Sequence, residues 1–165
     1  MKKTIALLLV SILVPALSAC TTDGGAPSTE PKGEITNNNL PTVSSNSGDA
    51  PQISAPKGNP PADLVAEDVI EGTGATAQVE STVTVHYTLM SWSSGQILES
   101  SWNSGPATFP LSQVILGWQQ GVPGMKEGGR RLLVIPPDLA YGESGAGSVG
   151  PNETLIFVVD LISIQ

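Results

Sequence analysis

The run from Thr82 to Leu89 constrains the fold more than any other stretch, because its side chains alternate between two chemical classes with a period of two residues. The apolar and aromatic set consists of Val83, Val85, Tyr87 and Leu89, and the polar set consists of Thr82, Thr84, His86 and Thr88. Such alternation is typical of a strand in an antiparallel sheet with one face on the core and one wetter face. A domain built on such a sheet is therefore expected.

Other apolar runs extend this sheet. Residues 130–135 and 154–164 are rich in β-branched and apolar side chains and predict two more strands. The inner face of the last strand is predicted to carry Leu155, Phe157, Val159 and Leu161. Shorter strands are expected near 64–70, 97–101 and 108–111. The one helical pattern spans 114–121, where Gly121 and Pro123 end it. One short helix packed into the concave face of an antiparallel sheet makes an α+β domain.

The first twenty residues have the pattern of an export signal. Lys2 and Lys3 precede a mostly apolar run at 5–17, which is shorter than the ~20 residues that a membrane-spanning helix needs. The sequence Leu17-Ser18-Ala19-Cys20 that follows resembles the lipobox of bacterial lipoproteins. The resemblance implies cleavage after residue 19 and a lipid on the Cys20 sulfur, which anchors the protein on the extracytoplasmic face of a cell membrane or in a periplasm. An ordinary signal peptide cut after Ala19, with Cys20 left free, is the alternative.

Residues 20–62 are predicted to be a lipidated cysteine followed by a disordered linker. The stretch is rich in Gly, Pro, Ser and Asn, has few large apolar side chains, and shows no sustained period of 2 or 3.6 residues. Such a segment cannot offset its ordering entropy by burial. A flexible tether of this length has a root-mean-square reach of roughly 35 Å. Residues 63–165 remain as the single folded domain.

Composition excludes several classes of function. The formal net charge is -8 and the isoelectric point is about 4.4, which argues against nucleic acid as a partner. Cys20 is the single cysteine, so no internal disulfide can form, and no metal constellation is expected. His86 is the single histidine and is interpreted as structural. The glycines between 142 and 150 do not follow a strand and open a helix, so no dinucleotide loop and no cofactor are expected.

The C-terminal domain resembles a known family over nearly its whole length. The matching residues, in family order, are Val85-His86-Tyr87-Thr88, Gly95, Leu98-Glu99-Ser100-Ser101, Val114-Ile115-Leu116-Gly117-Trp118, Gly121-Val122, Met125, Gly128, Arg130, Pro137, Ala140-Tyr141-Gly142 and Thr154-Leu155-Ile156-Phe157. This set is similar to the FKBP family of peptidyl-prolyl isomerases, the immunophilins that bind tacrolimus and rapamycin. The resemblance implies a strongly curved antiparallel sheet of five or six strands wrapped around one short helix.

The resemblance also implies an apolar active-site cup between helix and sheet. The implied catalytic set is Tyr87, Glu99, Trp118, Tyr141 and Phe157, and the implied substrate-binding set is Leu98, Phe109, Val114, Ile115 and Val149. Trp118 would form the floor, and the backbone N–H of Ile115 and the hydroxyl of Tyr141 would bind substrate carbonyls. Glu99 stands where the family usually has Asp. Leu98 and Ala107 replace aromatic residues, so weaker binding and slower turnover are expected.

Two functions follow from such a cup. The first is a peptidyl-prolyl isomerase that acts without covalent chemistry on unfolded, proline-containing exported proteins and that also takes macrolides such as rapamycin or tacrolimus. The second is a non-catalytic module or chaperone that holds proline-containing segments in the same pocket. Leu98 and Ala107 favour the second, whereas Trp118, Tyr141 and Phe157 favour the first.

Overall fold

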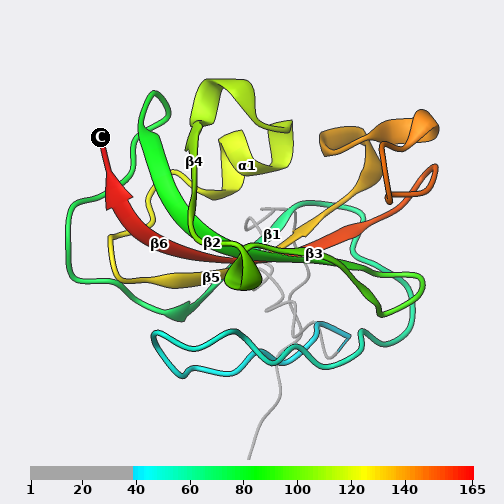
Figure 1. Ribbon diagram of the computed structural model, residues 1–165. Coiled ribbons are helices and arrows are strands. Elements are labelled where there is room, and N and C mark those ends of the chain that lie inside the picture. Colours follow the sequence, from blue (N-terminus) through cyan, green and yellow to red (C-terminus); the bar gives the residue numbers. More distant parts are fainter. Residues whose placement is uncertain (1–38) are drawn as a thin grey trace, which may run out of the picture. The chain divides into compact units, whose positions relative to one another are not determined.

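The structure is a computed structural model that describes residues 39–165. The predicted signal peptide, Cys20 and the linker up to residue 38 lie outside the described residues. Six antiparallel strands form one sheet in the order β1-β5-β6-β2-β3, with β4 also paired to β2 (Figure 1). The strands are β1 (Val65–Ile70), β2 (Thr82–Ser91), β3 (Ile97–Ser100), β4 (Ala107–Pro110), β5 (Arg130–Ile135) and β6 (Leu155–Ile164). The predicted α+β fold, a curved six-stranded sheet with one short helix, is confirmed.

The two ten-residue strands β2 and β6 form the centre of the sheet. They pair along their whole length, from Val83 opposite Ile164 to Ser91 opposite Leu155, with a bulge between Thr84 and Val85. The other edge of β2 is divided between two short strands, because β4 pairs with its first half and β3 with its second half. The sequence predicted every one of these strands to within two residues.

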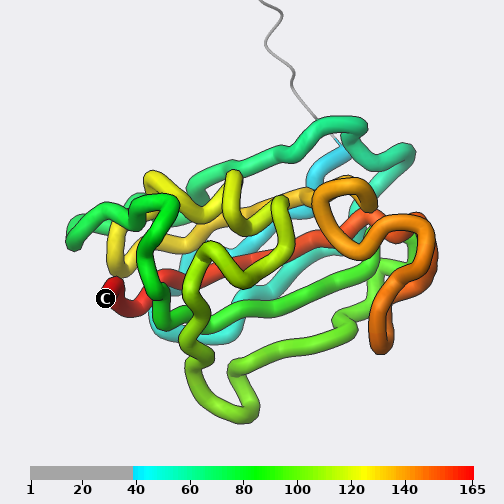
Figure 2. The backbone as a smooth tube through the Cα atoms, turned by 90° about the horizontal axis from the view of Figure 1, so that it is seen from above, coloured from blue at the N-terminus to red at the C-terminus, as the bar shows by residue number. Residues whose placement is uncertain are grey.

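The helix α1 (Leu116–Gly121) lies on the inner face of the sheet, and the segment 137–150 stands at one end of the same face (Figure 2). The helix packs very closely on β5. A Cβ atom on Gly117 would lie 2.3 Å from Ile135, and one on Gly121 would lie 2.7 Å from Leu133. Position 117 therefore needs glycine, and a larger residue at position 121 would force the buried Leu133 side chain to move. The helix begins at Leu116 rather than at residue 114, so the two residues before it have extended backbone and line a cavity.

The sheet is apolar on both faces along β5 and β6. Alternate residues of β6 point inward, which confirms the predicted inner set of Leu155, Phe157, Val159 and Leu161. A second buried cluster on the outer face contains Met90, Trp92, Leu132, Val134, Ile156 and Val158. An apolar face of this size must be covered, and the chain covers it with its own residues 39–58.

Residues 39–58, the N-terminal hairpin, lie across the outer face on the side of the sheet away from α1 (Figure 1, cyan). Leu40, Val43 and Ile53 pack on the outer cluster. Val43 and Ile53 form an antiparallel bridge between the two arms of the hairpin, and the indole Nε1 of Trp92 donates to the carbonyl of Gly58 at 3.3 Å. The structure thus differs from the predicted disordered linker over residues 39–62. Three apolar side chains suffice because the sheet already presents an apolar surface to receive them.

The side chain of Arg130 joins the hairpin to the sheet. Its side chain is completely buried, and its Nε donates to Asp160 Oδ1 at 2.8 Å. The two other nitrogens donate to the carbonyls of Ser44, at 2.8 Å, and Asp49, at 2.6 Å, in the hairpin. One guanidinium therefore joins β5, β6 and the hairpin.

Candidate active site

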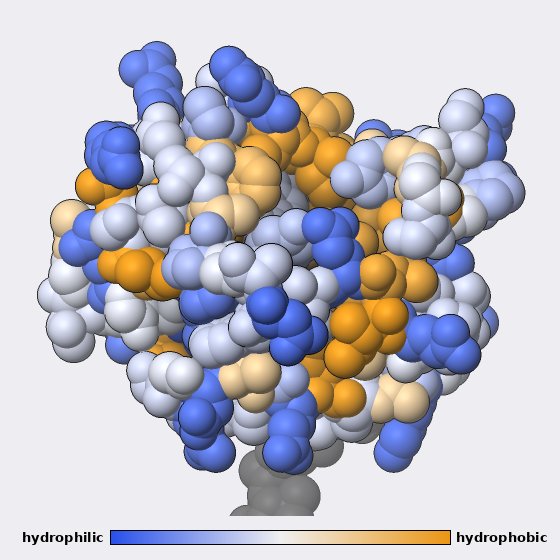
Figure 3. All heavy atoms as spheres, viewed as in Figure 1, coloured by the Kyte–Doolittle hydropathy of each residue, from blue (hydrophilic) through white to orange (hydrophobic). Residues whose placement is uncertain are grey.

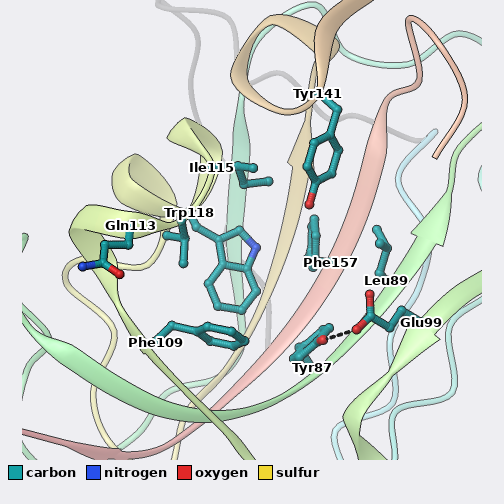
Figure 4. A pocket seen from close by; sticks show the side chains of 10 residues that line it. Tyr87, Leu89, Glu99, Phe109, Gln113, Ile115, Trp118, Tyr141 and Phe157 are labelled. Carbon is teal, nitrogen blue, oxygen red and sulfur yellow. Dashed lines mark hydrogen bonds between the residues drawn. The ribbon is translucent and has the colours of Figure 1, made fainter. Parts of the chain in front are cut away.

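A cavity of about 360 Å³ opens on the inner face of the sheet, beside α1. That volume is within the ordinary range for small-molecule and peptide pockets. Its lining consists of Tyr87, Leu89, Glu99, Phe109, Gln113, Val114, Ile115, Trp118, Tyr141 and Phe157 (Figure 4). In the space-filling view, apolar surface gathers between α1 and the segment 137–150, and hydrophilic side chains project around it (Figure 3). The cavity is thus an apolar cup with a polar surround.

Four aromatic rings define the shape of the cup. The Trp118 indole stands nearly perpendicular to the rings of Phe157, Tyr87 and Phe109, with centroid separations of 5.4, 5.9 and 5.9 Å. Edge-to-face contacts at such distances are favourable beyond the area that they bury. Trp118 is only 4% exposed, yet it borders the cavity. The indole therefore forms a fixed floor and the three other rings form walls.

Each ring is placed by an element of the inner face. Trp118 comes from α1, which the glycines on either side of it allow to approach β5. Tyr87 lies on β2, and its neighbour on the same face, Leu89, pairs with Phe157 of β6. Phe109 comes from β4, whose pairing with β2 brings it beside Tyr87 at a centroid distance of 6.1 Å. The period-two pattern of the strands therefore builds the walls.

One short polar contact crosses the wall of the cup. The Tyr87 hydroxyl donates to Glu99 Oε1 at 2.5 Å, between adjacent strands β2 and β3 (Figure 4). Burial, and then the hydrogen bond to Glu99, raise the pKa of Tyr87 from 10.0 to about 12. The phenol is therefore neutral at physiological pH and is held in one orientation. The longer Glu99 side chain in place of the family's Asp still makes this contact.

Two other polar groups border the cavity without a hydrogen-bond partner among residues 39–165. The Ile115 amide makes no hydrogen bond to any of residues 39–165. Tyr141 is 37% exposed and reaches over the cup from the segment 137–150, with its hydroxyl directed toward the cavity (Figure 4). Both groups are thus free to bind carbonyl oxygens of a ligand.

Eight of the ten residues that the sequence indicated line the cavity. Leu98 and Val149 do not. Leu98 is half-buried and packs against the inner core, and Leu89 occupies the wall beside Glu99 instead. Val149 is drawn into the core by its two reciprocal hydrogen bonds with Ala146. Both residues support the site from outside its lining.

Sequence reasoning missed Leu89 and Gln113 as lining residues. Leu89 could have been found, because it shares the strand face of Tyr87 two residues away. Gln113 could not have been found from its residue type, because a glutamine does not by itself indicate a position in an apolar pocket. It lines the cavity because it immediately precedes Val114, and its side-chain amide is directed away from the aromatic rings (Figure 4).

Most of the lining of this cup is aromatic or aliphatic. Its lining includes no serine, cysteine or lysine that could act as a nucleophile. Within residues 39–165, no group of three or more His, Cys, Asp or Glu side chains is placed to hold a metal ion. The same part of the chain contains no helix with the length and apolar character to cross a bilayer. What the cup provides is a largely apolar, aromatic surface with two hydrogen-bond donors at its rim.

Comparison with known proteins identifies the class. Residues 74–162 match the model of the family described as FKBP-type peptidyl-prolyl cis-trans isomerase. The FK506-binding protein of Streptomyces anulatus is 52% identical over 119 residues, which cover 69% of this chain and 96% of that protein. The probable FK506-binding protein of Corynebacterium glutamicum is 49% identical over 114 residues, covering 68% of this chain and 97% of the relative.

A solved structure has the same fold. The crystal structure of FkpA from Escherichia coli matches with a TM-score of 0.59 and 38% identity, over 62% of this chain and 48% of that one. The chain therefore belongs to the FKBP family and is a peptidyl-prolyl cis-trans isomerase. This assignment decides between the two functions left open by the sequence, in favour of the enzyme.

The similarity to the Streptomyces protein reaches beyond the family match. The match to the Streptomyces protein covers 69% of this chain, which is more residues than the family match over 74–162 contains. Only three residues of the sequence follow residue 162. Most of the additional shared length therefore precedes residue 74, in β1 and the segment that leads to it.

Proposed function

We propose that this isomerase acts on unfolded, proline-containing segments of exported proteins, and that it does so from a lipid-anchored position outside the cytoplasm. The observation that carries the proposal for the site is the Trp118 floor, to which three aromatic rings of the wall stand nearly perpendicular. A prolyl ring is a compact apolar group, so it can rest on the indole while the preceding peptide bond lies against the rim.

Such a cup accelerates rotation by favouring the twisted amide. The Xaa–Pro bond interconverts over a barrier of about 20 kcal/mol, in tens to hundreds of seconds. Resonance places charge on the oxygen of the planar amide, and this charge is lost when the bond twists. A water-poor surface therefore penalises the planar state relative to the twisted one. Each 1.36 kcal/mol of this difference is worth about a factor of ten in rate.

Hydrogen bonds at the rim hold the chain while the bond turns. We infer that the N–H of Ile115 and the hydroxyl of Tyr141 bind carbonyls on either side of the rotating bond, since both residues line the cavity. The hydrogen bond from Tyr87 to Glu99 orders the wall of the cup, because it fixes the phenol ring and uses the hydroxyl proton of Tyr87. Neither role requires transfer of a proton to or from the substrate.

Isomerisation of Xaa–Pro tetrapeptides, followed by NMR exchange or a protease-coupled assay, tests the activity of the full chain. We expect acceleration at micromolar protein, with modest turnover because Leu98 and Ala107 replace aromatic residues of the family. Peptides that vary the residue before proline would then define the preference. Absence of acceleration by folded protein would contradict the assignment of this cup as the reacting site.

Macrolide binding is proposed on the same pocket. The relatives from Streptomyces and Corynebacterium are named for FK506 binding. Rapamycin or FK506 should quench or shift the fluorescence of Trp118, and Trp118→Ala should abolish the response. Trp92 and Trp102 contribute background signal, so the Trp118→Ala variant also serves as the baseline. Retained binding in that variant would place the drug elsewhere.

Anchoring through Cys20 rests on the lipobox-like sequence alone. Metabolic labelling with a fatty acid, followed by membrane fractionation, tests it. We expect the native chain to incorporate label and to sediment with membranes, and Cys20→Ser to do neither. Label-free native protein in the soluble fraction would favour an ordinary signal peptide. The tethered enzyme would meet client chains as they emerge unfolded from export.

A further inference from the structure

The peptide bond between Val114 and Ile115 carries two groups that must point in opposite directions. In a trans peptide, the carbonyl of the first residue and the N–H of the second lie on opposite sides of the chain. Fixing the Val114 carbonyl therefore also fixes the direction of the Ile115 N–H. That N–H is the rim donor that has no acceptor among the described residues.

The helix itself does not hold this peptide. Ile115 occupies the cap position of α1 and has extended backbone, with φ -58° and ψ 152°, and no side-chain cap bond is present there. The first backbone bonds of the helix run from the amides of Trp118 and Gln119 to the Ile115 carbonyl, which belongs to the next peptide. A flip of the Val114–Ile115 peptide would therefore break no hydrogen bond of the helix.

The Gln119 side chain holds the peptide instead. Its Nε2 donates to the Val114 carbonyl at 2.8 Å. Gln119 does not line the cavity, whereas Val114 and Ile115 both do. The amide of Gln119 therefore approaches the carbonyl from outside the cup and leaves the Ile115 N–H on the cavity side.

We propose that Gln119 is a positioning residue for the isomerase, which orients the Ile115 N–H toward the substrate by binding the Val114 carbonyl. The proposal rests on the proposed function in one respect, namely that the Ile115 N–H binds a substrate carbonyl. It adds a residue outside the lining to the machinery of the site. The required chemistry at position 119 is a hydrogen-bond donor, since the group to be held is a carbonyl oxygen.

Paired substitutions at 119 and 120 test this requirement. Gln119→Glu keeps the shape of the side chain, but its carboxylate cannot donate and repels the carbonyl, so kcat/KM should fall by about fivefold to tenfold. Gln119→Lys retains a donor at similar reach and should stay within about twofold of the native chain. Gln120→Glu and Gln120→Lys place the same charges on the adjacent, exposed residue and should leave kcat/KM unchanged. Equal urea midpoints would show that the variants remain folded.

The Ile115 amide itself gives a readout that does not depend on activity. In substrate-free protein, its amide NMR shift and hydrogen-exchange rate should change in Gln119→Glu but not in Gln119→Lys or Gln120→Glu. An unchanged Ile115 signal together with native kcat/KM in Gln119→Glu would overturn the proposal, as would an equal loss in Gln120→Glu. If the native chain shows no isomerase activity, the proposed function fails, and the Ile115 signal still decides whether Gln119 orients the peptide.

Discussion

Replacing Arg130 by methionine should release the N-terminal hairpin and destabilise the domain severely. The Arg130 side chain is completely buried and bonds to Asp160 on β6 and to two hairpin carbonyls. Methionine fills much of the same volume but donates nothing. The variant therefore removes the polar connection while leaving the apolar packing of the stem.

The magnitude follows mainly from the partner that is left behind. The Asp160 side chain is 16% exposed, so its carboxylate would remain charged in a largely dry site. Removal of one member of a buried ion pair costs about 3–5 kcal/mol. The carbonyls of Ser44 and Asp49 add little, because a released hairpin returns them to water. A loss of about 4 kcal/mol is a large share of the 5–15 kcal/mol that holds a typical domain together.

The loss should depend on pH in a defined direction. Burial raises the pKa of Asp160, and Arg130 opposes this shift. Without Arg130, the folded-state pKa rises further above its unfolded value, so keeping Asp160 ionised in the folded state costs more as the pH rises through that range. The difference between native and variant stability should therefore be smallest in acid and largest near neutrality.

Urea unfolding at several pH values, followed by circular dichroism, measures both effects. Lys126→Met is the control, because it breaks only the exposed pair with Glu71 and should leave the free energy of unfolding nearly unchanged. Proteolysis within the hairpin should accelerate in Arg130→Met alone. A free energy of unfolding for Arg130→Met within 1 kcal/mol of the native value at pH 7, or a loss that does not shrink in acid, would refute this account of the clamp.

The remaining predictions concern the pocket and the outer face. Trp118→Leu removes the floor and should lower kcat/KM about 100-fold, or about 2.7 kcal/mol of differential stabilisation, in the tetrapeptide assay. Tyr87→Phe should change the free energy of unfolding by less than about 1 kcal/mol, because Glu99 is exposed and water replaces the hydroxyl. The ultraviolet titration curve of native protein, after subtraction of the curve of Tyr87→Phe, should show one tyrosine with a pKa of about 12. The raised pKa of Tyr87 contributes folding stability that is present below pH 10 and should be lost as the pH rises from 10 toward 12. A chain that begins at Asp63 should bind the dye ANS and unfold at lower urea than one that begins at Asn39, because its outer cluster is uncovered; equal midpoints and no dye binding would contradict this.

Much of the sheet could be predicted from the sequence because its strands are apolar and place alternate residues on the inner face. The inner residues of β6 and the apolar face of β2 follow directly from the period of two. The cavity lining could be predicted where a residue type is chemically distinctive, as with Trp118 and Tyr141. Val149 could not be placed, because a hydrogen-bonded turn with Ala146 decides whether its side chain faces the cup or the core.

The N-terminal hairpin could not be predicted, for a different physical reason. Its composition is that of a linker, and only Leu40, Val43 and Ile53 contact the outer cluster. Composition measures what a segment can bury by itself. It cannot show that a distant sheet supplies the apolar surface, or that Arg130, far along the chain, supplies two donors to its carbonyls.

The burial of both faces of the sheet, which made the hairpin unpredictable from its own composition, also affects the pocket. Phe157, a wall of the cup, lies on β6 between Ile156 and Val158, whose side chains point to the opposite face and lie under the hairpin. A strand packed on both faces has fewer accessible arrangements than one with a wet side, and an apolar cup favours a twisted amide only if its walls keep their positions as the bond turns. We therefore expect the chain that begins at Asp63 to lose catalytic efficiency as well as stability, even under conditions where it remains folded. Native kcat/KM in that chain, measured at a temperature well below its unfolding transition, would show that the inner face holds the pocket without support from the outer one.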